Sequence, residues 1–263
     1  MGDVLYKDEA AAEYDRAFSH VSEHFLPFLL GAAGLAPGMR VLDVATGTGL
    51  AAQAALALVG PSGSVTATDV SPAMVEKAYT RLAGARNLSV SVEDGQSLSF
   101  PDESFDAVIC SLGLMFFPDP QQGLSELCRV LRPGGRAAVS VLTAPERSYN
   151  GRINVIIAPY APAFAETVKR TFALGSEERL RPLFDAAGFN EMLMTREAHR
   201  FTLPSFDAYF GPFERGGGSS GQAYISLPKD VRVKVREELR SNLNDTGGPV
   251  HIDVEFGFAS GRR

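Results

Sequence analysis

Short apolar runs and polar breaks alternate regularly through the first half of the chain. Runs typical of β-strands occupy residues 41–45, 64–69, 88–93, 105–111 and 136–142. Helix-forming segments lie between several of them, at 50–58, 72–83 and 119–131. Continuous apolar strands separated by helices indicate a parallel sheet that is covered on both faces. The pattern therefore predicts an α/β fold with a doubly wound, mostly parallel sheet.

The pattern changes on both sides of this region. Apolar residues at spacings of three and four predict a helix within 11–29, and alternation predicts a final, antiparallel strand at 250–258. Helices are also predicted at 176–187 and 228–243, and a strand at 192–201. Residues 144–174 are expected to be irregular or a broken helical stretch, and residues 216–221 a flexible glycine-serine run.

These segments suggest a division of the chain. We expect a helical N-terminal cap (1–34), a cofactor-binding core (35–143), an insertion (144–175), a continuation of the core (176–203), an insertion or lid (204–248) and a final core strand (249–263).

Composition restricts the possible partners. The 263 residues are 45% hydrophobic and 21% charged, as in ordinary globular proteins, and the net charge of −6 disfavours a nucleic-acid partner. Two cysteines, Cys110 and Cys128, are too few for a disulfide framework or a four-cysteine zinc site. The sequence has no apolar signal region at its start and no apolar run of membrane-spanning length, so we expect a cytoplasmic protein without a membrane partner.

A glycine-rich turn follows the first predicted strand. The segment VLDVATGTG (41–49) leads directly into a run of helix formers. Glycines let the backbone approach a ligand closely, and the free N–H groups at the helix start favour negative ligand groups. Asp69 ends the second predicted strand, twenty positions after Gly49, and a carboxylate there can accept both hydroxyls of an adenosine ribose. Together these features predict a cofactor that contains adenosine.

Two classes of cofactor fit this pair. Residues 47–52 match the dinucleotide pattern G-x-G-x-x-G/A, which would suit an NAD(P)-dependent oxidoreductase. However, no tyrosine is followed four residues later by lysine, the pair expected of a short-chain dehydrogenase.

Further motifs extend the pattern along the chain. After VLDVATGTG come VTATDVSPAMVEKA, VSVEDGQSLSFPDESFDAVIC and LRPGGR, in that order. Over about residues 35–142 this series resembles the class I S-adenosylmethionine-dependent methyltransferases, and within them the quinone-biosynthesis and small-molecule subgroup, methyltransferase type 11. The first motif departs from the usual form of the subgroup at Ala45 and Thr46, where Gly-Cys is common.

The resemblance implies a Rossmann-like fold and the transfer of a methyl group from S-adenosyl-L-methionine to a small organic acceptor. A non-catalytic module that keeps the cofactor site remains an alternative. The resemblance implies no metal, and no catalytic base is assigned. The expected cofactor-binding residues, most of them at strand ends that converge on one crevice, are Tyr14, Ala45, Gly47, Thr48, Gly49, Asp69, Val70, Met74, Asp94, Gly95, Gln96 and Ser111.

Two further features have competing interpretations. Asp43, inside the first strand, is expected either to orient the glycine turn from behind or to contact the ligand. The sequence HVSEH at 20–24 fits the zinc-peptidase pattern H-x-x-E-H. Because the rest of such a site is missing from the sequence, we interpret this match as a coincidence.

Overall fold

The computed structural model describes residues 8–263, with side chains from Phe18 onward. The α-helices of the described residues are α1 (Asp8–Ala32), α2 (Leu50–Val59), α3 (Pro72–Arg81), α4 (Pro120–Val130), α5 (Gly151–Ile157), α6 (Pro162–Thr171), α7 (Glu177–Ala186), α8 (Phe206–Glu214), α9 (Gly218–Ser226) and α10 (Lys229–Asn242). The strands are β1 (Arg40–Val44), β2 (Ser64–Asp69), β3 (Leu88–Val92), β4 (Phe105–Ser111), β5 (Leu131–Leu142), β6 (Asn190–Leu203) and β7 (Val250–Arg262). Short 3-10 turns lie at Leu114–Phe116, Pro145–Arg147 and Ala158–Tyr160.

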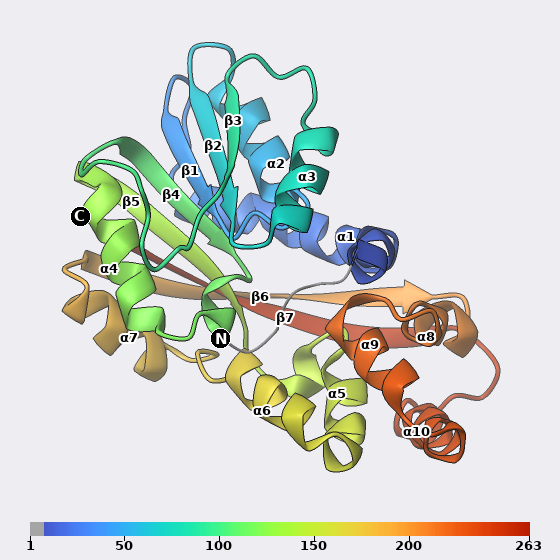
Figure 1. Cartoon of the computed structure of the whole chain (residues 1–263). Helices are drawn as coiled ribbons and strands as arrows, with labels where there is room; N and C mark the ends of the chain where they lie inside the picture. The colour runs from blue at the N-terminus through green and yellow to red at the C-terminus, as the bar shows by residue number, and fades with distance from the viewer. Residues whose placement is uncertain (1–7) are drawn as a thin grey trace. The chain divides into compact units, whose positions relative to one another are not determined.

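The strands form one sheet in the order β3-β2-β1-β4-β5-β7-β6 (Figure 1). Strands β1 to β5 pair in parallel. Strand β7 runs antiparallel to β6, because the side-chain pairs Arg262–Glu191, Arg200–Asp253 and Thr202–His251 advance in opposite directions along the two strands. The predicted doubly wound, mostly parallel sheet with an antiparallel final strand is confirmed.

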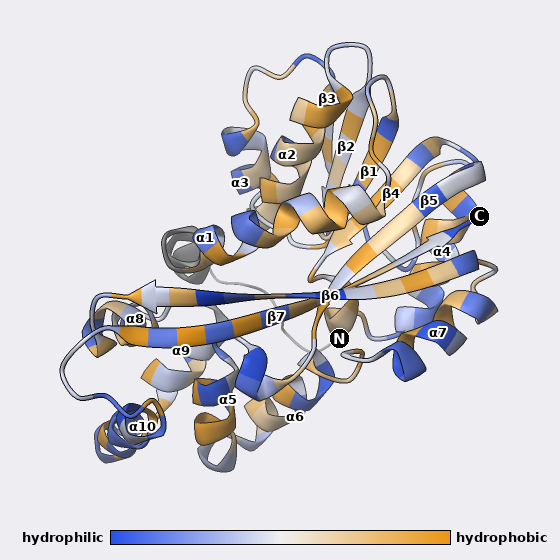
Figure 2. Cartoon of the chain, turned by 180° about the vertical axis from the view of Figure 1, so that it is seen from behind, coloured by the Kyte–Doolittle hydropathy of each residue, from blue (hydrophilic) through white to orange (hydrophobic). Residues whose placement is uncertain are grey.

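The central strands are apolar because they are buried on both faces. In β4, the residues from Phe105 to Cys110 are all buried, and Figure 2 shows hydrophobic colours along most of β4 and β5. Helix α2 is built almost entirely from small and branched apolar residues and buries Ala51, Ala52 and Ala55. Strands that are buried on both faces are typical of parallel sheets covered by helices.

Contacts divide the described chain into two compact units. One comprises residues 8–21, 142–173 and 198–255, with helices α5, α6, α8, α9 and α10. The other comprises Ser22–Val141, Leu174–Glu197 and Phe256–Arg263 and contains β1 to β4, nearly all of β5, and helices α2, α3, α4 and α7. The glycine turn and Asp69 both belong to this second unit, so their geometry is described within it.

Two local predictions were wrong. The glycine-serine run at 216–221 is not a flexible loop, since α9 begins at Gly218. A Cβ atom on Gly221 would lie 2.5 Å from the backbone carbon of Gly216, and Gln222 donates a hydrogen bond to the Gly216 carbonyl, so these glycines permit close backbone packing. The fifth strand was expected at 136–142, yet β5 extends over Leu131–Leu142, and within the added part Gly134 donates a hydrogen bond to the Arg263 carbonyl.

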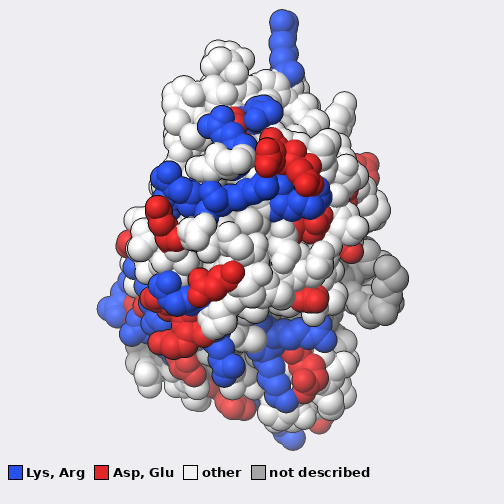
Figure 3. All heavy atoms as spheres, turned by 90° about the vertical axis from the view of Figure 1, so that its left-hand side faces the viewer, with Lys and Arg blue, Asp and Glu red and all other residues white. Residues whose placement is uncertain are grey.

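Ion pairs join the strands at their starting ends. Asp106, at the start of β4, accepts a hydrogen bond from the backbone N–H of Arg40 (2.7 Å) and pairs with Arg40 and Arg132. Burial acts to raise the pKa of the Asp106 carboxyl, but these hydrogen bonds and cationic partners lower it below its usual value. Figure 3 shows lysine and arginine interspersed with acidic side chains on one face of the molecule. Within the described residues, none of the helices is both long and apolar enough to cross a membrane.

Candidate cofactor site

The glycine turn, residues 45–49, connects β1 to α2 and contains three residues with left-handed backbone angles. They are Ala45 (φ 58°), Gly47 (φ 56°) and Gly49 (φ 89°). At Gly49 the helix α3 approaches closely, because an added Cβ atom would lie 3.2 Å from Ala78. At Gly47, by contrast, an added Cβ atom would meet nothing within 4 Å. The outer side of the turn is therefore open to a ligand, while its inner side is packed.

Asp69, the last residue of β2, lies next to this turn. One carboxylate oxygen accepts a hydrogen bond from the backbone N–H of Gly47 (2.9 Å), and the other accepts one from the N–H of Ser71 (2.9 Å). Burial raises the pKa of Asp69, while these backbone donors act to lower it. Each carboxylate oxygen can accept a second hydrogen bond, so the side chain can hold the turn and still accept two ligand hydroxyls.

Asp43 lies behind the turn in the middle of the sheet. Its carboxylate is completely buried and accepts a hydrogen bond from the hydroxyl of Thr46 (2.6 Å). The other oxygen, Oδ1, has no hydrogen-bond partner among the described residues. Burial raises the pKa of Asp43 to about 7, against the lowering effect of the Thr46 hydroxyl. Both of the roles expected for Asp43 are compatible with this geometry, because one oxygen orients the turn and the other is unoccupied.

Helix α3 is attached to the turn near both of its ends. Ser71, whose N–H donates to Asp69, is the N-cap of α3, and its hydroxyl is buried without a hydrogen-bond partner among the described residues. Arg81, in the last turn of the helix, donates from Nε to the carbonyl of Thr48 (2.7 Å). The consecutive residues Thr46, Gly47 and Thr48 are thus each held by a different side chain.

Replacing Arg81 with methionine is expected to loosen the turn without unfolding the protein. The change removes a charged hydrogen bond worth about 1 kcal/mol at a partly exposed site, so amide hydrogen exchange in residues 47–49 should become roughly fivefold faster. Arg86→Met, at an exposed position beyond α3, is the matched control and should leave this exchange unchanged. Equal exchange rates in the two variants would mean that Arg81 does not hold the turn.

Several other expected site residues lie beside these groups. Gly95 faces the end of β1, since an added Cβ atom would lie 2.9 Å from Val44 and 2.5 Å from Phe117. The backbone N–H of Glu93 donates to the carbonyl of Asp69, which places the end of β3 next to β2. Val70 is 65% exposed, whereas Met74, in the N-terminal turn of α3, is buried.

Four expected site residues remain: Asp94, Gln96, Ser111 and Tyr14. The carboxylate of Asp94 is exposed and accepts hydrogen bonds from the backbone and side chain of Gln96, so it caps its own turn. Gln96 in turn accepts from the N–H of Asp119, at the start of α4. Ser111 ends β4. The side chain of Tyr14 lies outside the described residues.

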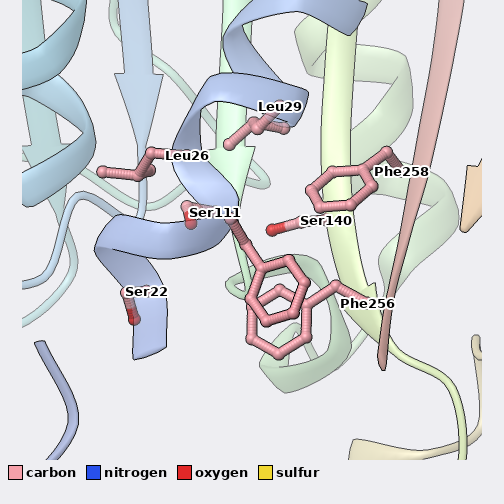
Figure 4. A pocket seen from close by; sticks show the side chains of 8 residues that line it. Ser22, Leu26, Leu29, Ser111, Ser140, Phe256 and Phe258 are labelled. Carbon is pink, nitrogen blue, oxygen red and sulfur yellow. The ribbon is translucent and has the colours of Figure 1, made fainter. Parts of the chain in front are cut away.

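Ser111 also lines the space beneath the second half of α1. The other lining residues in Figure 4 are three phenylalanines, two leucines and two serines: Phe25, Phe256, Phe258, Leu26, Leu29, Ser22 and Ser140. Phe25 and Phe256 stack at a centroid distance of 4.2 Å. In this structure the space is too narrow for a water molecule, so its lining residues pack α1 against the sheet.

Sequence reasoning did not include Thr46, Ser71, Arg81 or Gly113 among the site residues. Thr46 and Ser71 lie beside residues of the recognised motifs, and their short polar side chains are the feature of the sequence that could have identified them as site residues. Arg81 and Gly113 carry no local signal, because their importance depends on neighbours distant in sequence. An added Cβ atom on Gly113 would lie 2.5 Å from the Cβ atom of Ala45.

The known proteins that are similar to this chain include methyltransferases. The model of the family described as "Methyltransferase domain" matches residues 42–139. A demethylmenaquinone methyltransferase of Clavibacter sepedonicus is 34% identical over 198 residues, which cover 69% of this chain and 80% of that protein. An uncharacterised protein of Mycobacterium tuberculosis is 34% identical over 170 residues, 64% of this chain. The aligned part spans 60% of the length of this relative.

The fold also recurs among solved structures. The crystal structure of the YcgJ protein from Bacillus subtilis superimposes with a TM-score of 0.61 at 21% identity, over 91% of this chain and 98% of that one. The strand order, the glycine turn with its acidic partner and the similarity to the Clavibacter enzyme point to the same family. The chain belongs to the methyltransferase domain family, within the class I S-adenosylmethionine-dependent methyltransferases.

Proposed function

We propose that this protein binds S-adenosylmethionine at the turn between β1 and α2 and transfers its methyl group to a small organic acceptor. The observation that carries this proposal is the pairing of the Asp69 carboxylate with the N–H of Gly47, beside an open turn. Family membership supplies the expectation of the cofactor.

The residues present fit this cofactor in charge and in hydrogen-bonding capacity. Asp69 has lone pairs left for the two ribose hydroxyls, and the open side of Gly47 leaves room for close approach of the ligand. Two buried polar atoms near the turn, Asp43 Oδ1 and Ser71 Oγ, have no hydrogen-bond partner among the described residues. Such atoms in native proteins commonly face a ligand or ordered water. The other residues expected to contact the cofactor, including Tyr14, Val70, Met74, Asp94, Gly95, Gln96 and Ser111, also belong to this proposal.

S-adenosylmethionine supplies a methyl group that is already activated on a sulfonium. The task of the protein is then to align the acceptor with this methyl and to exclude water, which can contribute about 7–11 kcal/mol in favourable cases. Asp69 and the turn would fix the adenosyl part of the cofactor. We propose that the segments 1–34, 144–175 and 204–248 serve as the cap and insertions that contact the acceptor.

The class of acceptor is inferred from relatives. The Clavibacter protein is named for methylation of demethylmenaquinone, so we propose a small organic acceptor with a substantial apolar part. We also propose a cytoplasmic protein that does not act on nucleic acid, supported by two free, buried cysteines and a net charge of −6.

Calorimetric titration with S-adenosylmethionine, S-adenosylhomocysteine and NADH tests the cofactor assignment. We expect binding of the first two ligands and none of NADH. Binding of NADH alone would instead favour the oxidoreductase alternative. Transfer of labelled methyl from S-adenosylmethionine to a panel of small apolar acceptors tests the activity, and cofactor binding without transfer to any of them would favour the non-catalytic module.

A further inference from the structure

The strongest feature that the proposed function leaves unused is the buried pair Asp43 and Thr46. Asp43 is inaccessible to solvent, and Thr46 is only 7% exposed. A buried carboxylate is costly unless it is hydrogen-bonded or protonated, and here one oxygen has a donor while the other has none among the described residues. Burial opposes the ionisation of Asp43, and the Thr46 hydroxyl is the largest of the influences that favour it.

The groups that act on Asp43 come from each element around it. Asp69 on β2 opposes its ionisation, and the backbone N–H of Ala52 in α2 favours it. On β4 the neighbouring titratable group is Cys110, and burial followed by the charge of Asp43 raises the pKa of this thiol to about 12. Cys110 thus stays neutral near neutral pH. Burial and the charge of Asp69 oppose the ionisation of Asp43, while the Thr46 hydroxyl and the Ala52 N–H favour it.

We infer that Thr46 is a positioning residue for cofactor binding, which sets the proton occupancy of the buried Asp43 and thereby the pH at which the turn accepts a cationic cofactor. The inference rests on the proposed function, because S-adenosylmethionine brings a sulfonium and an ammonium group to this turn. A nearby cation favours the ionised carboxylate. A protonated Asp43 must lose its proton for the favourable interaction to form, so affinity falls as the pH decreases.

The sign and size of the effect follow from linkage. The pKa of Asp43 without ligand is about 7, so the contribution of Asp43 to the affinity should become complete above this pH. One pH unit below it, affinity should be about tenfold lower. Thr46→Val removes the hydroxyl that favours ionisation, so the midpoint should move to higher pH. Thr46→Ser keeps the hydroxyl and should retain the midpoint of the native protein.

The experiment measures the dissociation constant of S-adenosylmethionine from about pH 5.5 to 9 for the native protein, Thr46→Val, Thr46→Ser and Asp43→Asn. The α-amino group of the ligand also titrates, near about pH 8, but this contribution is common to all four proteins. Differences between their curves therefore report on Asp43. The neutral ligand 5′-methylthioadenosine is the control, and its affinity should change less than threefold over the same range.

We expect the Thr46→Val curve to shift to higher pH and the Asp43→Asn protein to bind weakly without the Asp43 transition. Identical midpoints in the native protein and Thr46→Val would overturn the inference. Should Thr46→Val fail to fold by circular dichroism, an Asp43→Asn curve that keeps the native transition overturns it equally. A native protein that binds no S-adenosylmethionine at any pH contradicts the proposed function itself, which is a distinct result.

Discussion

Asp69→Ala is expected to weaken the binding of S-adenosylmethionine by about 1.5–3 kcal/mol, or roughly ten- to 150-fold. The substitution removes the two carboxylate oxygens expected to accept the ribose hydroxyls. It also leaves the N–H groups of Gly47 and Ser71 without the acceptor that each has in the native protein. Loss of ligand contacts and loosening of the turn thus act in the same direction. Isothermal calorimetry measures the change directly.

Asp102→Asn is a suitable control for the removal of a carboxylate charge. Asp102 belongs to the same unit, its side chain is 68% exposed, and it pairs with Arg129. Exposed ion pairs contribute about 0–1 kcal/mol to stability, and this one lies away from the turn in sequence and in contacts. We expect native cofactor affinity in this variant. An Asp69→Ala protein that binds within twofold of the native affinity would remove Asp69 from the site.

Gly113→Ala is expected to lower the free energy of unfolding by about 1–3 kcal/mol, the usual cost of an added methyl group in a filled core. The new Cβ atom would lie 2.5 Å from the Cβ atom of Ala45 and 2.8 Å from the sulfur of Cys110. Neither neighbour can move easily, because Ala45 is held in a left-handed conformation and Cys110 is fully buried. Since Ala45 begins the turn, the clash should also reduce cofactor affinity.

A second substitution tests the cause of this loss. Ala45→Gly removes the closest clashing atom and relieves the left-handed conformation, so the double variant Ala45→Gly/Gly113→Ala should recover part of the stability and affinity. Gly31→Ala is the matched control, because an added Cβ atom inside helix α1 meets nothing within 4 Å, and it should stabilise the protein by about 0.5–1 kcal/mol. Chemical denaturation measures the free energy of unfolding of the native protein and of these four variants. Additive effects of the two site substitutions would mean that Ala45 and Gly113 do not interact.

Local sequence patterns predicted most of the secondary structure. Each of β1 to β4 begins and ends within one residue of its expected position. These strands are continuous apolar runs, and their ends are marked by polar, glycine or proline residues. The helices within 144–174 and the start of α9 were harder to predict, because glycine and proline normally interrupt helices and only packing shows where they do not.

The sequence alone determined the class of fold, the glycine turn and its acidic partner. Strand periodicity and glycine spacing are local properties, and parallel strands necessarily bring their carboxyl ends to one edge of the sheet. Only the tertiary structure decided which side chains hold the turn. The hydrogen bond from Arg81 to Thr48, the contact of Gly113 with Ala45 and the burial of Asp43 join residues from different elements. Such contacts depend on how helices and strands pack in three dimensions, and no spacing along the chain encodes them.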